Sequence, residues 1–145
     1  PDVQYMIAGW KPQWSDDGEI SGGLPQYLIN KLGAQKIGEL GQDVCSLCFP
    51  FQVPGTQDAF RPGVVSQDGL PSKEIFSENY FYEAGNGLII FLGDEPWFRI
   101  DVYGHAFFQA IDDLGIKRTS VVESYNGPTA PEMDRSVNSS YTSPT

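Results

Sequence analysis

Two acidic loops in this sequence carry the side chains best suited to chemistry. Their carboxylates belong to Asp16, Asp17, Asp94 and Glu95, and each loop follows an apolar segment. Paired carboxylates can bind Mg²⁺ or divide into a general acid and a general base. If the two apolar segments are neighbouring parallel strands, all four carboxylates meet at the sheet edge where open α/β sheets bind ligands.

The same carboxylates have a simpler interpretation as helix caps. A helical pattern follows each acidic loop. Asp is a preferred N-cap residue, and negative charge interacts favourably with the N-terminus of a helix. We therefore favour capping, with catalysis or metal binding as the alternative.

Other reactive side chains do not form a recognisable site in the sequence. Cys45 and Cys48 form a C-x-x-C pair, but a zinc site needs about four ligands, and a redox pair would begin a helix. We expect two reduced, partly buried thiols. The only histidine, His105, lies off the apolar face of a predicted helix.

Short motifs for phosphate binding, dinucleotide binding, zinc proteolysis and a nucleophile elbow are missing from the sequence. We therefore expect no catalytic residue, no metal site and no cofactor. Trp97, which follows Pro96, could be an exposed anchor for a partner. We favour the alternative that Trp97 folds over the sheet edge as part of the core.

The elements that would position these residues form a βαβ unit in the second half of the chain. The apolar run 88–92 predicts a strand, and another strand is expected from Lys117. A helix is predicted between them because its apolar residues recur at helical spacing, namely Tyr103, Phe107, Ala110, Ile111 and Leu114.

The first half is also predicted to be βαβ. It has a strand over 4–10, a helix that ends at Leu32 and a strand over 34–40. Either the regular helix starts near Leu24 with Pro25 in its first turn, or Pro25 kinks a helix that starts earlier. We favour a short or irregular first turn over 19–23. Such crossovers join parallel neighbours.

The middle of the chain gives weaker signals. Residues 41–62 predict a long irregular excursion without a helix, and the turn residues 84–87 predict a hairpin between 79–82 and 88–92. Together these elements predict a three-layer α/β/α domain with a mostly parallel, mixed sheet.

Composition limits the partners. The chain has 145 residues, 40% hydrophobic residues, a formal net charge of −10 and a pI near 4.3. The charge argues against nucleic acid and against an anionic membrane, and no apolar run approaches the roughly 20 residues of a membrane span. Two cysteines fit a cytoplasmic protein.

Several segments, in their order and spacing, resemble one family. They are Ile7–Trp10, Asp16–Glu19, Leu24–Ala34, Arg61-Pro62, Gly93–Pro96 and Leu114–Arg118. This set is similar to the PAC2 family, the proteasome assembly chaperone 2-like proteins, over about residues 5–128. The resemblance implies a fold like that of nucleoside phosphorylases, and oligomerisation. In archaeal and eukaryotic members it implies chaperoning of proteasome assembly.

From Tyr125 onward the composition changes to Asn, Gly, Pro, Thr and Ser, so we expect an α/β PAC2-like domain over residues 1–127 and an irregular C-terminal arm over 128–145. The hydrophobic-Tyr-x tail of some family chaperones is missing, because the chain ends Tyr141-Thr-Ser-Pro-Thr. Family chains usually continue with further helices, so this chain could be a fragment.

The expected function is a non-enzymatic, protein-binding or assembly-chaperone-type homo-oligomer, with proteasome-like subunits as possible partners. The alternative is a small-molecule or nucleotide-binding enzyme of the nucleoside phosphorylase or ATP-dependent ligase type that uses the acidic loops. The candidate ligand or partner residues are Asp16, Asp17, Arg61, Asp94, Glu95 and Trp97.

Overall fold

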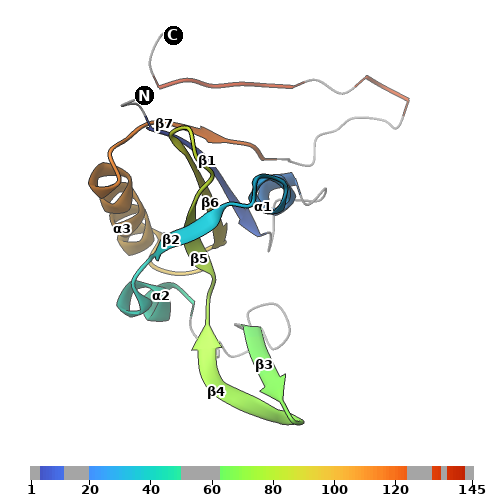
Figure 1. Cartoon of the computed structure of the whole chain (residues 1–145), viewed down its shortest axis with the longest axis vertical. Helices are drawn as coiled ribbons and strands as arrows, with labels where there is room; N and C mark the ends of the chain where they lie inside the picture. Colours follow the sequence, from blue (N-terminus) through green and yellow to red (C-terminus); the bar gives the residue numbers. More distant parts are fainter. Residues whose placement is uncertain (1–3, 12–19, 50–62, 124–131, 135–136, 143–145) are drawn as a thin grey trace.

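The computed structural model describes residues 4–11, 20–49, 63–123, 132–134 and 137–142, with the backbone alone for 63–67 and 71–76 (Figure 1). Its elements in chain order are β1 (Gln4–Lys11), α1 (Ile20–Leu32), β2 (Gln35–Glu39), α2 (Gln42–Cys48), β3 (Gly63–Gln67), β4 (Leu70–Phe76), β5 (Asn79–Glu83), β6 (Leu88–Asp94), α3 (Ile100–Asp113) and β7 (Ile116–Val121). Among the described residues, no helix has the length and apolar character needed to cross a membrane.

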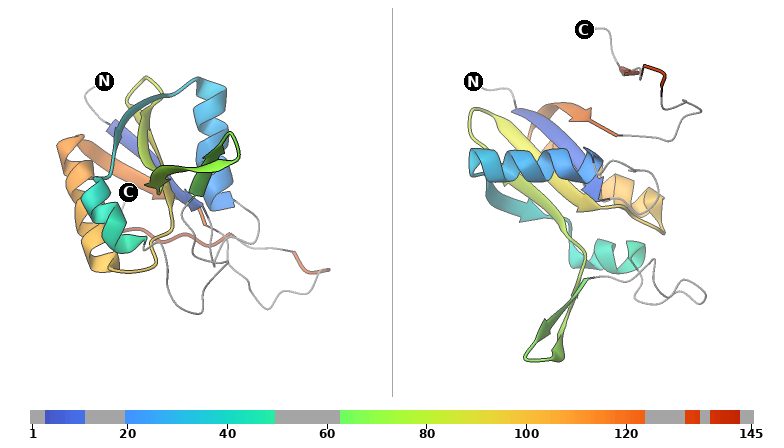
Figure 2. Two further views of the ribbon diagram at one scale, coloured as in Figure 1. Left: turned by 90° about the horizontal axis from the view of Figure 1, so that it is seen from below. Right: turned by 90° about the vertical axis from the view of Figure 1, so that its right-hand side faces the viewer.

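A mixed five-stranded sheet forms the middle of three layers. Its strand order is β2-β5-β6-β1-β7, and only β5 runs opposite to the others. Helix α1 covers one face, and α2 and α3 cover the other (Figures 1 and 2). The β3–β4 hairpin is a separate two-stranded sheet that projects beyond the main sheet. The expected α/β/α architecture with a mixed sheet is confirmed.

The central pairing joins β1 to β6 in parallel, as the acidic-loop argument required. Their register places Lys11 opposite Asp94, so the carboxyl ends of both strands lie at the same edge. The predicted hairpin is also confirmed, since β5 pairs antiparallel with β6 and Asn79 lies opposite Gly93. This edge therefore receives residues from three adjacent strands.

The predicted parallel neighbour relation in the first half is wrong. Strand β2 does not lie beside β1 but pairs antiparallel with β5 at the sheet edge. Burial explains the difference: β6 is apolar and buried for most of its length, whereas the side chains of β2 are mostly exposed. The more apolar strand takes the central position, and the polar strand is placed at the edge.

The favoured irregular turn over 19–23 is wrong from Ile20 onward. Helix α1 begins at Ile20, and Pro25 lies inside it. Proline has no N–H to donate to the carbonyl four residues earlier, which is that of Ser21. This carbonyl lies against β1, where a Cβ on Gly9 would sit 1.8 Å from its oxygen. Pro25 therefore lies in the part of α1 that packs against β1.

The expectation of no helix within 41–62 is also wrong. Helix α2 has seven residues, too short for a periodic signal, and it buries Cys45 and Cys48 against the sheet. Short helices are held mainly by tertiary packing, so local sequence does not reveal this one. Residues 50–62 lie outside the described part of the chain.

The capping interpretation fails for the second acidic loop. Helix α3 begins at Ile100, and its N-cap is Arg99, in the left-handed region with φ of 47°. Asp94 and Glu95 lie five and four residues before that cap, so neither satisfies the first turn of the helix. The first acidic loop, with Asp16 and Asp17, lies outside the described residues.

Strand β6 supplies both faces of the core by simple alternation. Ile89 and Phe91 belong to the cluster under α2 and α3, whereas Ile90 and Leu92 pack with Ile29 of α1. The ring of Phe91 has its centroid within 5.7 Å of three others, those of Phe81, Trp10 and Phe107. Such aromatic pairs add stability beyond their buried area.

We expect Gly9→Ala to lower the free energy of unfolding by at least about 2 kcal/mol, because the new methyl group would overlap the Ser21 carbonyl. Gly23→Ala is the matched control, since a Cβ there meets nothing within 4 Å. Alanine favours the helix at that site by about 0.5 kcal/mol. Urea unfolding curves measure both, and equal stability of the two variants would contradict the account.

Candidate functional site

The carboxyl edge of β1 and β6 holds a compact charged group. The backbone N–H of Glu78 donates to Oδ2 of Asp94 at 2.7 Å, and the N–H of Asp94 donates to the Glu78 carbonyl at 2.8 Å. The Lys11 ammonium forms an ion pair with the Glu78 carboxylate. Burial raises the pKa of Asp94, and the nearby Lys11 charge partly opposes that rise. The Asp94 side chain therefore serves to anchor the segment that leads into β5.

The candidate residues divide into described and undescribed groups. Asp16, Asp17 and Arg61 lie outside the described residues, so the proposed meeting of two acidic loops stays a prediction. Asp94 is the last residue of β6, Glu95 and Trp97 follow it in the chain, and all three are half-buried. The expectation that Trp97 turns back toward the body is compatible with its backbone N–H, which donates to the Cys48 carbonyl at 3.2 Å.

Cys48 joins the end of α2 to the segment before α3. Its carbonyl accepts hydrogen bonds from the N–H groups of Trp97 and Phe98, at 3.2 and 3.3 Å. Its thiol donates to the carbonyl of Arg99 at 3.7 Å. Arg99 holds its left-handed backbone beside a two-point contact with Asp101, at 3.2 and 3.1 Å. The C-x-x-C segment is thus a structural clamp.

Three exposed apolar side chains lie on the two segments that Cys48 joins. Leu47, Phe98 and Ile100 have exposed fractions of 51%, 41% and 65%. They belong to the two segments that Cys48 ties together, so they flank a single junction. We call these three residues the junction patch. Exposed apolar side chains gathered at one place are typical of protein contact surfaces.

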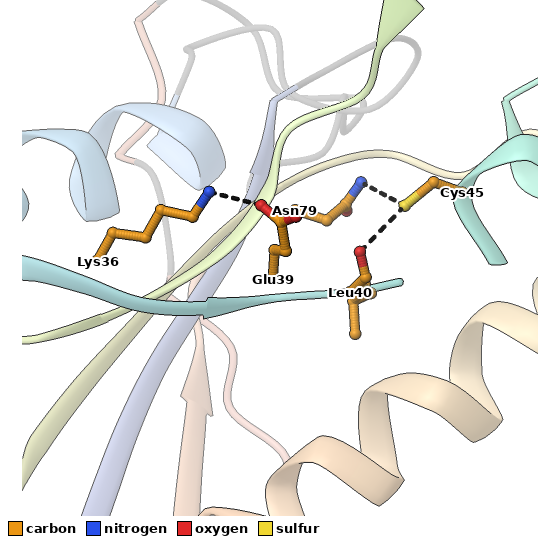
Figure 3. A network of polar contacts seen from close by, with 5 residues as sticks. All are labelled: Lys36, Glu39, Leu40, Cys45 and Asn79. Atoms are coloured by element: carbon orange, nitrogen blue, oxygen red, sulfur yellow. Dashed lines mark hydrogen bonds and ion pairs between the residues drawn. The ribbon is translucent and has the colours of Figure 1, made fainter. Parts of the chain in front are cut away.

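A chain of buried polar groups runs beneath the edge. The indole N–H of Trp10 donates to the Tyr103 hydroxyl at 2.8 Å, and that hydroxyl donates to Oδ1 of Asn79 at 2.7 Å. The Asn79 amide donates to Sγ of Cys45 at 3.8 Å, and the thiol donates to the Leu40 carbonyl at 3.7 Å (Figure 3). Burial strongly raises the pKa of Tyr103, which keeps its phenol neutral.

The chemistry available to these groups is limited by their bonding. Asp94 accepts a backbone N–H, Tyr103 links two side chains, and burial raises the pKa of both cysteine thiols. His105 is exposed on α3, as expected. No group of three or more metal-ligating side chains occurs within the described ranges.

The sequence did not reveal the series of hydrogen bonds through Tyr103, although one signal for it exists. Tyr103 and Phe107 were identified as core positions of a helix, and a buried tyrosine hydroxyl normally finds a partner. The partners Trp10 and Asn79 lie 93 and 24 residues away along the chain. Only the pairing of β1, β6 and β5 brings them together.

Tyr103→Phe is expected to lower the free energy of unfolding by about 2 kcal/mol. The change leaves the Trp10 indole N–H and the Asn79 amide oxygen buried without their partner. Tyr27→Phe is the matched control because the Tyr27 side chain is 60% exposed, and it should change stability by less than about 0.5 kcal/mol. Urea unfolding measures both, and a neutral Tyr103→Phe would refute the role of the hydroxyl.

Both thiols should resist alkylation in the native protein. Burial disfavours the thiolate, so a pKa raised above the usual value leaves less nucleophile near pH 8. A colorimetric thiol assay should find slow reaction in buffer and rapid reaction of two thiols in denaturant. Rapid native reaction of either cysteine would overturn the clamp geometry.

Comparison with known proteins identifies the family to which this chain is similar. The family model described as PAC2 family matches residues 13–144. A proteasome-assembly chaperone homologue from Mycobacterium tuberculosis has a similar fold, with a TM-score of 0.63 and 18% identity over 80% of this chain and 47% of that chain. A PAC2 family protein from Streptomyces avermitilis gives a TM-score of 0.58 and 19% identity over 80% and 47% of the two chains.

A search of curated protein sequences found no match. The present chain spans about half the length of the two solved structures. The family match covers most of the chain, and the two structures share its α/β fold. The chain belongs to the PAC2 family.

Proposed function

We propose that this chain is a non-enzymatic, protein-binding domain that self-associates and assists the assembly of other proteins. One observation carries the proposal: Lys11, Glu78 and Asp94, the described charged group at the sheet edge where α/β enzymes place their reactive groups, are bonded to the fold. Asp94 anchors the entry to β5, and Lys11 is paired with Glu78. Groups held in this way have little freedom to act as acid, base or nucleophile.

The junction patch supports a protein partner. Leu47, Phe98 and Ile100 expose apolar side chains beside the half-buried Trp97. Large apolar side chains dominate the energetics of protein contacts. We propose that the partner surface includes this patch and the candidate residues near it, Asp94, Glu95 and Trp97, together with Asp16, Asp17 and Arg61.

The named relative suggests the kind of partner. One similar structure is described as a proteasome-assembly chaperone homologue, and the family match joins the present chain to it. We therefore propose proteasome-like subunits as the first partners to test. Residues 1–127 would form the binding domain, and residues 128–145 would form an arm.

The test combines size and complex formation. Light scattering with size-exclusion chromatography should give a mass above 16.0 kDa for the chain alone. A further, larger complex is expected with purified proteasome subunits from the same source. Phe98→Ser with Ile100→Ser should weaken that complex about tenfold or more, because exposed apolar anchors are lost.

Tyr27→Ser is the control, since it removes an exposed aromatic residue from α1 on the other face. A monomer that forms no complex with any subunit would contradict the proposal. Equal weakening by the control would show that the junction patch is not the contact.

The alternative is a ligand-binding enzyme, supported by the Lys11, Glu78 and Asp94 group at the carboxyl edge. A thermal-shift series with nucleosides, inorganic phosphate, nucleotides and Mg²⁺ separates the two functions. Stabilisation that disappears in Asp17→Asn or Glu95→Gln would favour the enzyme. The binding-domain proposal predicts no such shift.

A further inference from the structure

The two edges of the main sheet differ in how open they are. Strand β2 closes one edge with five residues and a register shift in its middle, between Lys36 and Gly38. Its Lys36 ammonium pairs with Glu39 at 2.5 Å and lies 3.7 Å from the centre of the Tyr80 ring. Short length and a bulge are the usual devices that protect an edge strand from further pairing.

Strand β7 forms the other edge, and no described strand pairs with its outer side. Its register shift falls at its first pair, and the stretch Arg118–Val121 then pairs regularly with β1 on one side only. Every residue from Lys117 to Val121 is exposed. An extended, regular strand with unpaired backbone groups on its outer side is a template for one more strand.

The charged residues of β7 indicate which kind of segment would pair with it. Lys117 and Arg118 lie next to each other on β7, and neither forms an ion pair with the described residues. The other cations with described side chains, apart from Lys31, are paired: Lys11, Lys36 and Arg99. An adjacent cation doublet with no ion pair to a described residue is therefore distinctive in a chain of net charge −10. It attracts an acidic segment.

A second copy of β7 is a poor occupant for the same reason. Antiparallel pairing of the stretches Arg118–Val121 of two copies about a twofold axis would place Arg118 of one copy opposite Val121 of the other. The only charged side chains on such a ladder are cations, so it gains no attraction between opposite charges. The doublet thus favours a partner of opposite charge over a second copy at this edge.

We propose that β7 is a docking edge for an acidic, extended segment of a partner protein, which adds to the sheet as a strand beside Arg118–Val121. Backbone hydrogen bonds to β7 would hold the segment, and acidic side chains near Lys117 and Arg118 would select it. This inference rests on the proposed protein-binding function and assigns a second surface to it, distinct from the junction patch.

A short labelled peptide in which Glu alternates with Val is the probe for this edge. Fluorescence anisotropy with the full chain at low salt should show binding, and a matched peptide with Lys in place of Glu should bind at least about tenfold more weakly. Amide exchange of residues 118–121 should slow when the Glu peptide is bound, because outward N–H groups become paired.

The double variant Lys117→Glu with Arg118→Glu should weaken the Glu peptide about tenfold and strengthen the Lys peptide. Lys31→Glu is the matched control, an exposed and unpaired cation on α1, and it should leave both affinities unchanged. Unchanged exchange at 118–121, or equal binding of the two peptides, would overturn the inference.

The peptide experiment on β7 and the subunit-binding experiment can fail independently of each other. If the chain binds protein subunits through the junction patch but the peptide does not protect β7, the docking edge is refuted and the protein-binding function stands. If the peptide docks on β7 as described while the chain forms no complex with any subunit, the docking edge stands and the assembly function is refuted.

Discussion

The Tyr103 hydroxyl is the contact on which the packing of this domain depends. It accepts the Trp10 indole N–H from β1 and donates to Asn79 of β5, so a single group on α3 is bonded to two strands. Asn79 continues to the Cys45 thiol on α2. In a buried site each unmade bond is costly, so this connected chain determines how both helices seat on the sheet. The aromatic cluster around Phe91 then fills the space beneath.

The carboxyl edge of the sheet has ionisable groups of the kind found in reaction sites, but here these groups hold segments of the fold together. The carboxylate of Asp94 is half-buried and holds the Glu78 backbone, while Cys48 holds the segment that leads into α3. Burying such groups is favourable only when their hydrogen bonds are made. These bonds hold the groups in the fold, and the exposed apolar side chains of the junction patch lie close to Cys48 and Trp97 along the chain.

The two edge strands of the main sheet, β2 and β7, differ from each other. One edge ends in a bulged strand with its own ion pair, and the other ends in β7, exposed from Lys117 to Val121. The matched part of this chain covers 47% of each of the two related solved structures. The two proposed partner surfaces, the apolar junction patch and residues 117–121 of the charged edge strand β7, both consist of exposed residues outside the core.

Local sequence determined β1, β6, α3 and the β5–β6 hairpin, because alternation, helical spacing and turn residues each leave a short-range signal. The parallel pairing that places Lys11 beside Asp94 was only a condition of the acidic-loop hypothesis, and the tertiary structure supplied it. The position of β2, the helix through Pro25, the short α2 and the cap at Arg99 were decided by tertiary structure. Each of these depends on burial against residues distant in the chain, and a local pattern does not encode such contacts.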